Sequence, residues 1–250
     1  MRFNESGSHS LRNEWLEFSR LHSLGFWEKK IMYSRVPGAS CNQIRRALFR
    51  ENGFEIAGQD QALQQNDHIF AIELKELYKY RCNSFAVIQH PAKRLAMIPA
   101  HLKSNRDGCA DTWNQMTGRQ WDSLSMMELA RMLASRKDLS VASHWWCPQE
   151  TCLIFKPESY TNIFKEGSLD KLAWWLGERG VQMETIQNGE SMVPNIRELD
   201  SKKELKDKKL DSIENFVSDN KFASAIMDAE LYEIAQALFE DDARIYAAAI

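Results

Sequence analysis

The chain changes from an apolar run to a helical pattern at Pro37-Gly38-Ala39-Ser40-Cys41-Asn42-Gln43-Ile44-Arg45-Arg46. The residues before it, 31–36, read Ile-Met-Tyr-Ser-Arg-Val and predict a buried strand. A strand that passes through a turn of small residues into a helix is a common phosphate-binding arrangement, because backbone N–H groups converge there and the helix dipole favours negative charge. This stretch therefore indicates an α/β fold with an anion-binding loop.

Further helices and strands are expected to alternate along the chain. The predicted helices span residues 11–24, 43–51, 69–80 and 168–177, a further helix is expected to begin at Ser123 or Ser125 and to end at residue 136, and residues 228–248 are expected to form a helix pair. The predicted strands span 31–36, 84–89, 151–155 and 181–186. Pro91 is expected to begin a helix that Pro99 bends or ends. This alternation favours a central parallel sheet flanked by helices. Residues 188–194 are expected to form a loop, and the charged run 202–209 a solvated helix or linker face.

The bulk properties narrow the class of protein. With 250 residues, of which 44% are apolar, the chain predicts one α/β domain, with a helical extension over residues 1–28 and a helical part over 195–250. The net charge of −3 argues against a nucleic-acid-binding surface. The sequence has no apolar run that could cross a bilayer, so no transmembrane segment is expected.

The cysteines and histidines argue against a metal site. The five cysteines form no Cys-x-x-Cys pair, and the six histidines are scattered without ligand spacing. Thiols that stay reduced are typical of a cytoplasmic protein, and that location is the prediction.

Three separated motifs resemble one protein family. The first is the loop at residues 37–45, the second is Phe85-Ala86-Val87-Ile88-Gln89-His90-Pro91-Ala92-Lys93-Arg94-Leu95, and the third is His144-Trp145-Trp146-Cys147-Pro148-Gln149. Their order and spacing resemble the carbohydrate-type (family 2-like) sulfotransferases, which transfer a sulfonate group from 3′-phosphoadenosine 5′-phosphosulfate (PAPS). The resemblance continues in order through residues 153–160, 169–177 and 238–246.

The resemblance implies a P-loop-like three-layer sandwich and a set of site residues. Its donor-binding positions fall on Pro37, Gly38, Ala39, Ser40, Cys41, Asn42 and Gln43 for the 5′-phosphosulfate, and on Gln89 and Met97 for the 3′-phosphate. His144 would be the base that removes the proton of the acceptor hydroxyl. The implied partners are PAPS and a carbohydrate or small-molecule acceptor, and no metal is required.

Five of these positions depart from the family pattern. Gly38 stands where the family has lysine, and Asn42 and Gln43 replace its hydroxyl pair. Gln89 stands in place of an arginine, and Met97 in place of a serine. Because cations and arginine forks bind phosphate most strongly, these changes predict weakened donor binding. Two hypotheses follow: a PAPS-dependent sulfotransferase, or a catalytically degenerate member that acts as a binding or interaction module.

Several residues have both a functional and a structural interpretation. His144 could be a base or a histidine packed among tryptophans, and Trp145 could stack on a ligand or fill the core. Gln149 and Glu158 are expected in structural roles. Five cations lie near the motifs and could offset the missing charges or form structural ion pairs: Arg35, Arg45, Arg46, Lys93 and Arg94.

Overall fold

The computed structural model describes residues 14–39, 41–54, 67–184, 207, 209–210 and 226–250. The chain separates into two compact units, which are described here one at a time. The sheet unit comprises Met1–Ile88, Gln149–Ser191 and Ile245–Ile250, and the helical unit comprises Gln89–Pro148 and Met192–Arg244. The single-domain organisation stays a prediction. The expected loop at 188–194 and most of the charged run at 202–209 lie outside the described residues.

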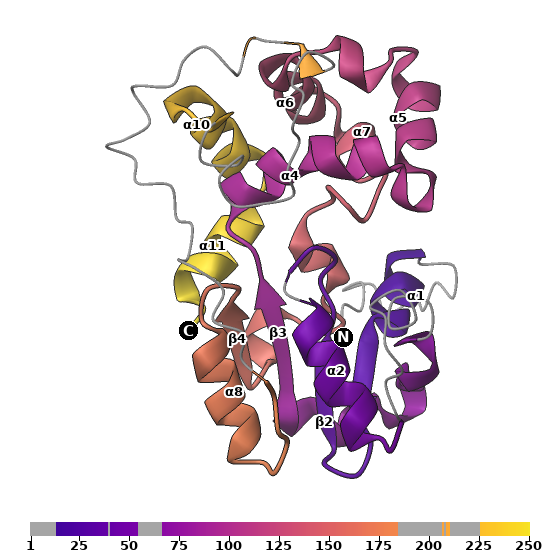
Figure 1. The fold of residues 1–250 in the computed structure, drawn as a ribbon, viewed down its shortest axis with the longest axis vertical. Helices are drawn as coiled ribbons and strands as arrows, with labels where there is room; N and C mark the ends of the chain where they lie inside the picture. Colours follow the sequence, from indigo (N-terminus) through magenta and orange to yellow (C-terminus); the bar gives the residue numbers. More distant parts are fainter. Residues whose placement is uncertain (1–13, 40, 55–66, 185–206, 208, 211–225) are drawn as a thin grey trace, which may run out of the picture. The chain divides into compact units, whose positions relative to one another are not determined.

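The sheet unit is built on a four-stranded mixed sheet in the order β1-β2-β3-β4 (Figure 1). Its strands are β1 (Ser23–Phe26), β2 (Ile31–Ser34), β3 (Ser84–Ile88) and β4 (Asn162–Lys165). The expected parallel arrangement holds for β2, β3 and β4, whereas β1 adds an antiparallel strand at one edge. All residues of β1, β2 and β3 are buried, which is typical of strands covered on both faces.

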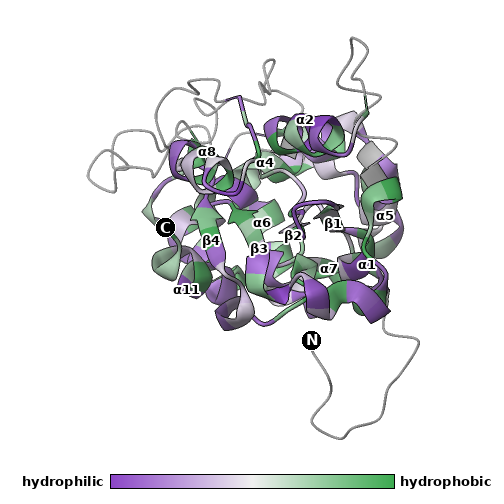
Figure 2. Ribbon diagram, turned by 90° about the horizontal axis from the view of Figure 1, so that it is seen from below, coloured by the Kyte–Doolittle hydropathy of each residue, from purple (hydrophilic) through white to green (hydrophobic). Residues whose placement is uncertain are grey.

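Helices cover both faces of this sheet. Figure 2 shows α2 (Cys41–Glu51) and α8 (Leu169–Gly177) on one face and α1 (Glu14–Leu21) on the other. The helices expected over 43–51 and 168–177 are confirmed. The inward face of α2 buries Ile44, Ala47 and Leu48. Ser168 occupies the N-cap position of α8, but its side chain makes no capping hydrogen bond.

Three expectations for the sheet unit are wrong. The helix expected over 11–24 ends at Leu21, because Ser23–Phe26 pairs with β2. The helix expected over 69–80 is two 3₁₀ helices, η1 (Asp67–Phe70) and η2 (Leu74–Lys79), separated by a β-bridge between Ala71 and Leu24. The strand expected over 151–155 begins instead in the 3₁₀ helix η6 (Gln149–Cys152).

A strand was also expected over 181–186, and the described residues of that range do not form one. Residues 181–184 have no regular structure, and residues 185–186 lie outside the described ranges. The edge strand next to β3 is β4, which the sequence pattern did not predict. Its pairing with β3, rather than a local pattern, makes it a strand.

The helical unit packs α4 (Pro91–Ser104), α5 (Cys109–Thr117), α6 (Met126–Ser135), α7 (Lys137–Ser140) and α10 (Ala229–Leu238) around one apolar core. The expected helix over 125–136 is confirmed, and Ser125 with Glu128 forms a capping box at its start. α10 and α11 (Glu240–Ala248) confirm the expected C-terminal helix pair.

Pro91 begins α4 as expected, but the helix does not end at Pro99. The helix continues to Ser104, and Pro99 is buried within it. Proline inside a helix removes one backbone hydrogen bond, at a cost of about 3 kcal/mol. Burial of its neighbours Leu95, Ile98 and Leu102 in the apolar core offsets that cost.

Candidate functional site

The loop after β2 has the strand–turn–helix geometry that the sequence predicts. The chain leaves β2 at Ser34 and enters α2 at Cys41. Between them the backbone N–H of Ala39 donates to the carbonyl of Val36 at 3.1 Å, which closes a tight turn. Pro37 and Ala39 are buried and Gly38 is exposed. Ser40 and the side chain of Cys41 lie outside the described residues.

Gly38 has a conformational role that the sequence did not reveal. Its φ of +87° lies in the left-handed region, which glycine adopts without strain. A lysine at this position would carry a penalty of about 1–2 kcal/mol for the same backbone. Glycine therefore suits the shape of this turn better than a lysine would.

The first turns of α2 present polar side chains. Asn42 is exposed, and Gln43 is half-buried, with its Oε1 buried and unpaired among the described residues. A depression in the sheet unit is lined by Gln43, Arg46, Arg50 and Glu184. Arg50 forms an ion pair with Glu184 at 3.1 Å, so this part of the surface is partly charge-balanced.

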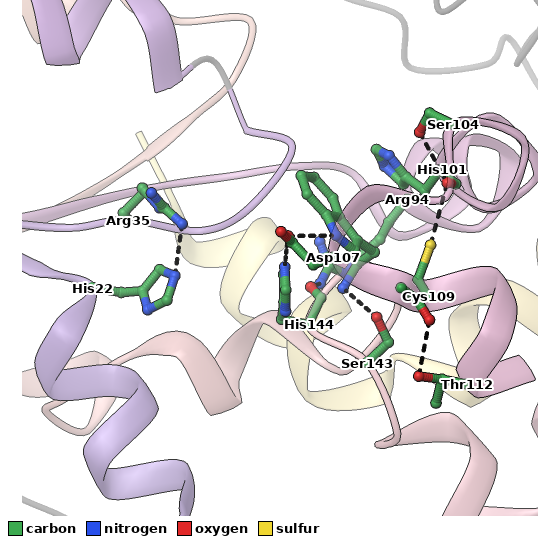
Figure 3. Close-up of polar contacts among 12 residues, drawn as sticks. His22, Arg35, Arg94, His101, Ser104, Asp107, Cys109, Thr112, Ser143 and His144 are labelled. Atoms are coloured by element: carbon green, nitrogen blue, oxygen red, sulfur yellow. Dashed lines mark hydrogen bonds and ion pairs between the residues drawn. The ribbon is translucent and has the colours of Figure 1, made fainter. Parts of the chain in front are cut away.

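Arg35, two residues before the loop, is held by a histidine of the sheet unit (Figure 3). Its Nη2 lies 2.7 Å from Nε2 of His22, whose Nδ1 lies 2.8 Å from the carbonyl oxygen of Phe18. Because a carbonyl only accepts, Nδ1 carries the hydrogen and the neutral Nε2 accepts from Arg35. Arg35 is thereby fixed beside the turn, whereas Arg45 on α2 is buried.

The second motif contributes Gln89, His90 and Met97 to the helical unit. Gln89 is buried at the end of β3, and Met97 is half-buried in α4. His90 caps α4, since its Nδ1 accepts from the N–H of Ala92 at 3.1 Å. Burial lowers the pKa of His90 to about 4, so the imidazole is neutral near pH 7. This cap assigns His90 a structural role.

Arg94 joins the second motif to the third. Its Nε donates to the carbonyl of Cys147 at 2.9 Å, and its Nη2 donates to the carbonyl of His144 at 3.0 Å. The side chain is only 1% exposed. The guanidinium therefore fixes the backbone of the His144 segment onto α4.

His144 is paired with an acidic residue that the sequence did not single out. Its Nε2 lies 3.1 Å from Oδ2 of Asp107, and Nε1 of Trp145 donates to the same oxygen at 3.3 Å (Figure 3). The His144 side chain is 24% exposed. Asp107 lies 37 residues before His144, and no spacing rule links the two.

Trp145 lies between two imidazole rings. The ring centroids of Trp145 and His144 are 5.0 Å apart, and those of Trp145 and His101 are 4.5 Å apart. His101, in the last turn of α4, was also not singled out by the sequence. Trp146 instead is fully buried, donates to the carbonyl of Leu139 at 2.8 Å and packs edge-on against Trp113.

The other residues with two interpretations lie in the sheet unit. Gln149 is buried at the start of η6, and Glu158 is exposed in η7 (Pro157–Ser159). Trp175 is buried beneath the guanidinium of Arg179, whereas Trp174 is 68% exposed. The burial of Gln149 and Trp175 matches a structural role, whereas the exposure of Trp174 does not match the core packing expected of it.

The predicted site residues fall in both units. The loop 37–43 belongs to the sheet unit, and Gln89, Met97 and His144 belong to the helical unit. Within the helical unit, the structure brings the motif at Arg94 and the motif at His144 together. The sheet unit holds the turn and Arg35.

Across the described ranges, no three histidine, cysteine or acidic residues are grouped as metal ligands would be. None of the described helices has the length and apolarity needed to cross a membrane. A comparison of the chain with the models of known protein families, with curated proteins and with solved structures finds no match.

Proposed function

We propose that this protein is a PAPS-dependent sulfotransferase of the carbohydrate type, which transfers a sulfonate group to a hydroxyl of a carbohydrate or small-molecule acceptor. The observation that carries the proposal is the pair of hydrogen bonds from Arg94 to the carbonyls of His144 and Cys147. Arg94 belongs to the motif at 85–95, and His144 and Cys147 belong to the motif at 144–149, about fifty residues later in the sequence. Both motifs resemble the family, and the side chain of Arg94 joins them.

The sheet unit supports the same proposal through its layers. Helices α2 and α8 lie on one face of the sheet and α1 on the other, as in a three-layer sandwich (Figure 2). The loop 37–43 follows a strand that is paired in parallel with β3. In a P-loop-like fold this is the edge at which a phosphate meets a helix N-terminus.

The proposed roles follow from the chemistry of each group. Backbone N–H groups of the loop and of α2 would hold the 5′-phosphosulfate, and the amide of Gln89 would donate to the 3′-phosphate. His144 would take the proton of the acceptor hydroxyl as its oxygen bonds to sulfur. The bond from sulfur to the phosphate oxygen breaks, and 3′-phosphoadenosine 5′-phosphate (PAP) leaves with that electron pair.

A second candidate is a degenerate member of the same family that binds a partner without catalysis. It is favoured by the turn at Gly38, whose positive φ disfavours the missing lysine, and by the neutral side chains of Gln89 and Met97. This candidate keeps the fold and predicts that no sulfonate is transferred.

Thermal unfolding with PAP tests the proposal. A ligand that binds the folded state raises the Tm by mass action, so PAP at millimolar concentration should stabilise the protein. AMP, which lacks the 3′-phosphate, should stabilise it less. The absence of any shift with PAP would contradict donor binding, and a shift without transfer to any acceptor would favour the degenerate candidate.

A matched pair of glycine variants assigns the shift to the loop. Gly38 and Gly53 flank α2, are both exposed and have φ values of +87° and +81°. Aspartate tolerates this conformation and adds a negative charge that repels phosphate. Gly38→Asp should abolish the PAP shift, whereas Gly53→Asp should keep it. Equal shifts in both variants would place the nucleotide elsewhere.

A further inference from the structure

We propose that Asp107 is a positioning residue that fixes the tautomer of His144, with the hydrogen on Nε2 and the proton-accepting lone pair on Nδ1. The inference deepens the proposed function and rests on it for the role of Nδ1 as the base. Its structural basis is the contact of Asp107 Oδ2 with both His144 Nε2 and Trp145 Nε1.

The contacts of Asp107 Oδ2 decide which nitrogen of His144 carries the hydrogen. The indole Nε1–H of Trp145 can only donate, so Asp107 Oδ2 acts as an acceptor at 3.3 Å. A carboxylate has no hydrogen to give, so Nε2 of His144, 3.1 Å from the same oxygen, must carry one. In the neutral imidazole the lone pair is then on Nδ1.

The position of Asp107 is built into the turn between α4 and α5. The residue has a φ of +54°, a left-handed conformation that aspartate adopts more readily than most residues. Asn105 braces this turn, since its Oδ1 accepts from the N–H of Ala110 at 2.9 Å and its Nδ2 donates to Asp111 at 3.1 Å. The backbone N–H of Gly108 also donates to the carbonyl of Asn105.

His144 is oriented from its backbone as well as from its ring. Arg94 holds the backbone carbonyl of His144, and Asp107 holds its Nε2 (Figure 3). The ring of Trp145 lies against that of His144, with the two centroids 5.0 Å apart. His101 packs on Trp145 and is the other titratable ring of this cluster. Such double anchoring is how a base is kept in one orientation for proton transfer.

The proposed step balances without a further reactant. Nδ1 of His144 takes the proton of the acceptor hydroxyl, and the acceptor oxygen forms its bond to sulfur. The bond between sulfur and the phosphate oxygen breaks, and PAP keeps the electron pair. The carboxylate of Asp107 stabilises the imidazolium that results.

The experiment is a pH titration of ¹⁵N-labelled protein followed through the imidazole nitrogens by NMR. Asp107→Gly removes the carboxylate and suits the positive φ of this position. Asp122→Asn, on η5 (Trp121–Ser123) of the same unit, is the control for loss of one acidic charge. His144 should show the Nε2–H tautomer in the wild type and in the control.

In Asp107→Gly, His144 should show a mixture of tautomers, because the carboxylate that accepts from Nε2 is gone. An Nδ1–H tautomer in the wild type would overturn the inference, as would an unchanged tautomer in Asp107→Gly. The titration uses no nucleotide, so it separates this inference from the proposed function. If PAP raises the Tm but His144 is not paired with Asp107, only the role of Asp107 is refuted. If His144 is paired with Asp107 but PAP does not raise the Tm, only the transferase activity is refuted.

Discussion

Arg94 donates through Nη2 to the backbone carbonyl of His144 at 3.0 Å, from a position in α4 that is almost fully buried. A second hydrogen bond runs from Nε to the carbonyl of Cys147, so the guanidinium donates to two backbone carbonyls. A planar guanidinium can serve two carbonyls at once, whereas an ammonium is a point donor on a flexible stem. The segment that carries His144 therefore depends on arginine at this position.

Replacement of Arg94 by lysine should destabilise the protein by about 1.5–3 kcal/mol, the value of hydrogen bonds to a charged group. Urea unfolding followed by tryptophan fluorescence measures the effect. Arg119→Lys, at an exposed position of the same unit, is the control and should stay within about 0.5 kcal/mol of the wild type. Equal unfolding midpoints for the two variants would mean that the two carbonyls do not depend on Arg94.

His90 should make the stability depend on pH. Burial lowers its pKa to about 4 in the folded protein, against about 6.5 in the unfolded chain. Between these values the unfolded chain binds more protons, so the free energy of unfolding rises with pH. The contribution is complete above about pH 6.5 and is lost as the pH falls toward 4, at no more than about 1.4 kcal/mol per pH unit.

Asparagine at position 90 should remove this slope and keep the helix cap, since an asparagine side chain also accepts from the backbone N–H of a helix start. Urea unfolding at several values between pH 4 and 6.5 compares His90→Asn with the wild type. His68→Asn, at an exposed position, serves as the control and should keep the wild-type slope. A His90→Asn protein with the same slope would show that His90 does not titrate as its burial implies.

Tyr160 lies at the centre of a buried hydrogen-bond network in the sheet unit. Its hydroxyl lies 2.6 Å from Oγ of Ser34 and accepts from the N–H groups of Ile154 and Phe155. Burial raises the pKa of Tyr160 to about 12, so the hydroxyl keeps its proton, and it shares with Ser34 a hydrogen bond in which either oxygen can be the donor. This bond ties the last residue of β2 to the segment after η6.

Tyr160→Phe leaves these buried groups without the hydroxyl and should cost about 1–3 kcal/mol of stability. Tyr78→Phe is the matched control, because Tyr78 is 68% exposed and should change the stability by less than about 0.5 kcal/mol. Chemical unfolding of both variants measures the difference. If both lose the same amount, the network contributes nothing specific.

The same network explains why part of the sheet could not be predicted. The apolar run 151–155 has the composition of a strand, but the N–H groups of Ile154 and Phe155 bond to the hydroxyl of Tyr160 instead of to a neighbouring strand. β1 could not be predicted either, because Ser23–Phe26 becomes a strand through its pairing with β2. In contrast β2, β3 and α2 carry local patterns that are sufficient by themselves.

In the candidate site, too, some features could be predicted from the sequence and others could not. The turn at 37–39 could be predicted from the local sequence, and His144 was singled out there as a candidate by its motif. The φ of Gly38 and the contact between Asp107 and His144 depend on the folded backbone, so no pattern in the sequence predicts them. Arg94 was predicted as part of a motif, but its role became clear only from its two carbonyl partners.

Hydrogen exchange of the loop tests the central claim most directly. Peptides that cover residues 36–46 should exchange more slowly with PAP than with adenosine, which lacks both phosphates, because the N–H groups of the loop and of α2 would bind the 5′-phosphate. The protection should be absent in Gly38→Asp and present in Gly53→Asp. Protection that is absent in the wild type with PAP, or the same with adenosine, would contradict the assignment of this loop as the sulfonate-donor site.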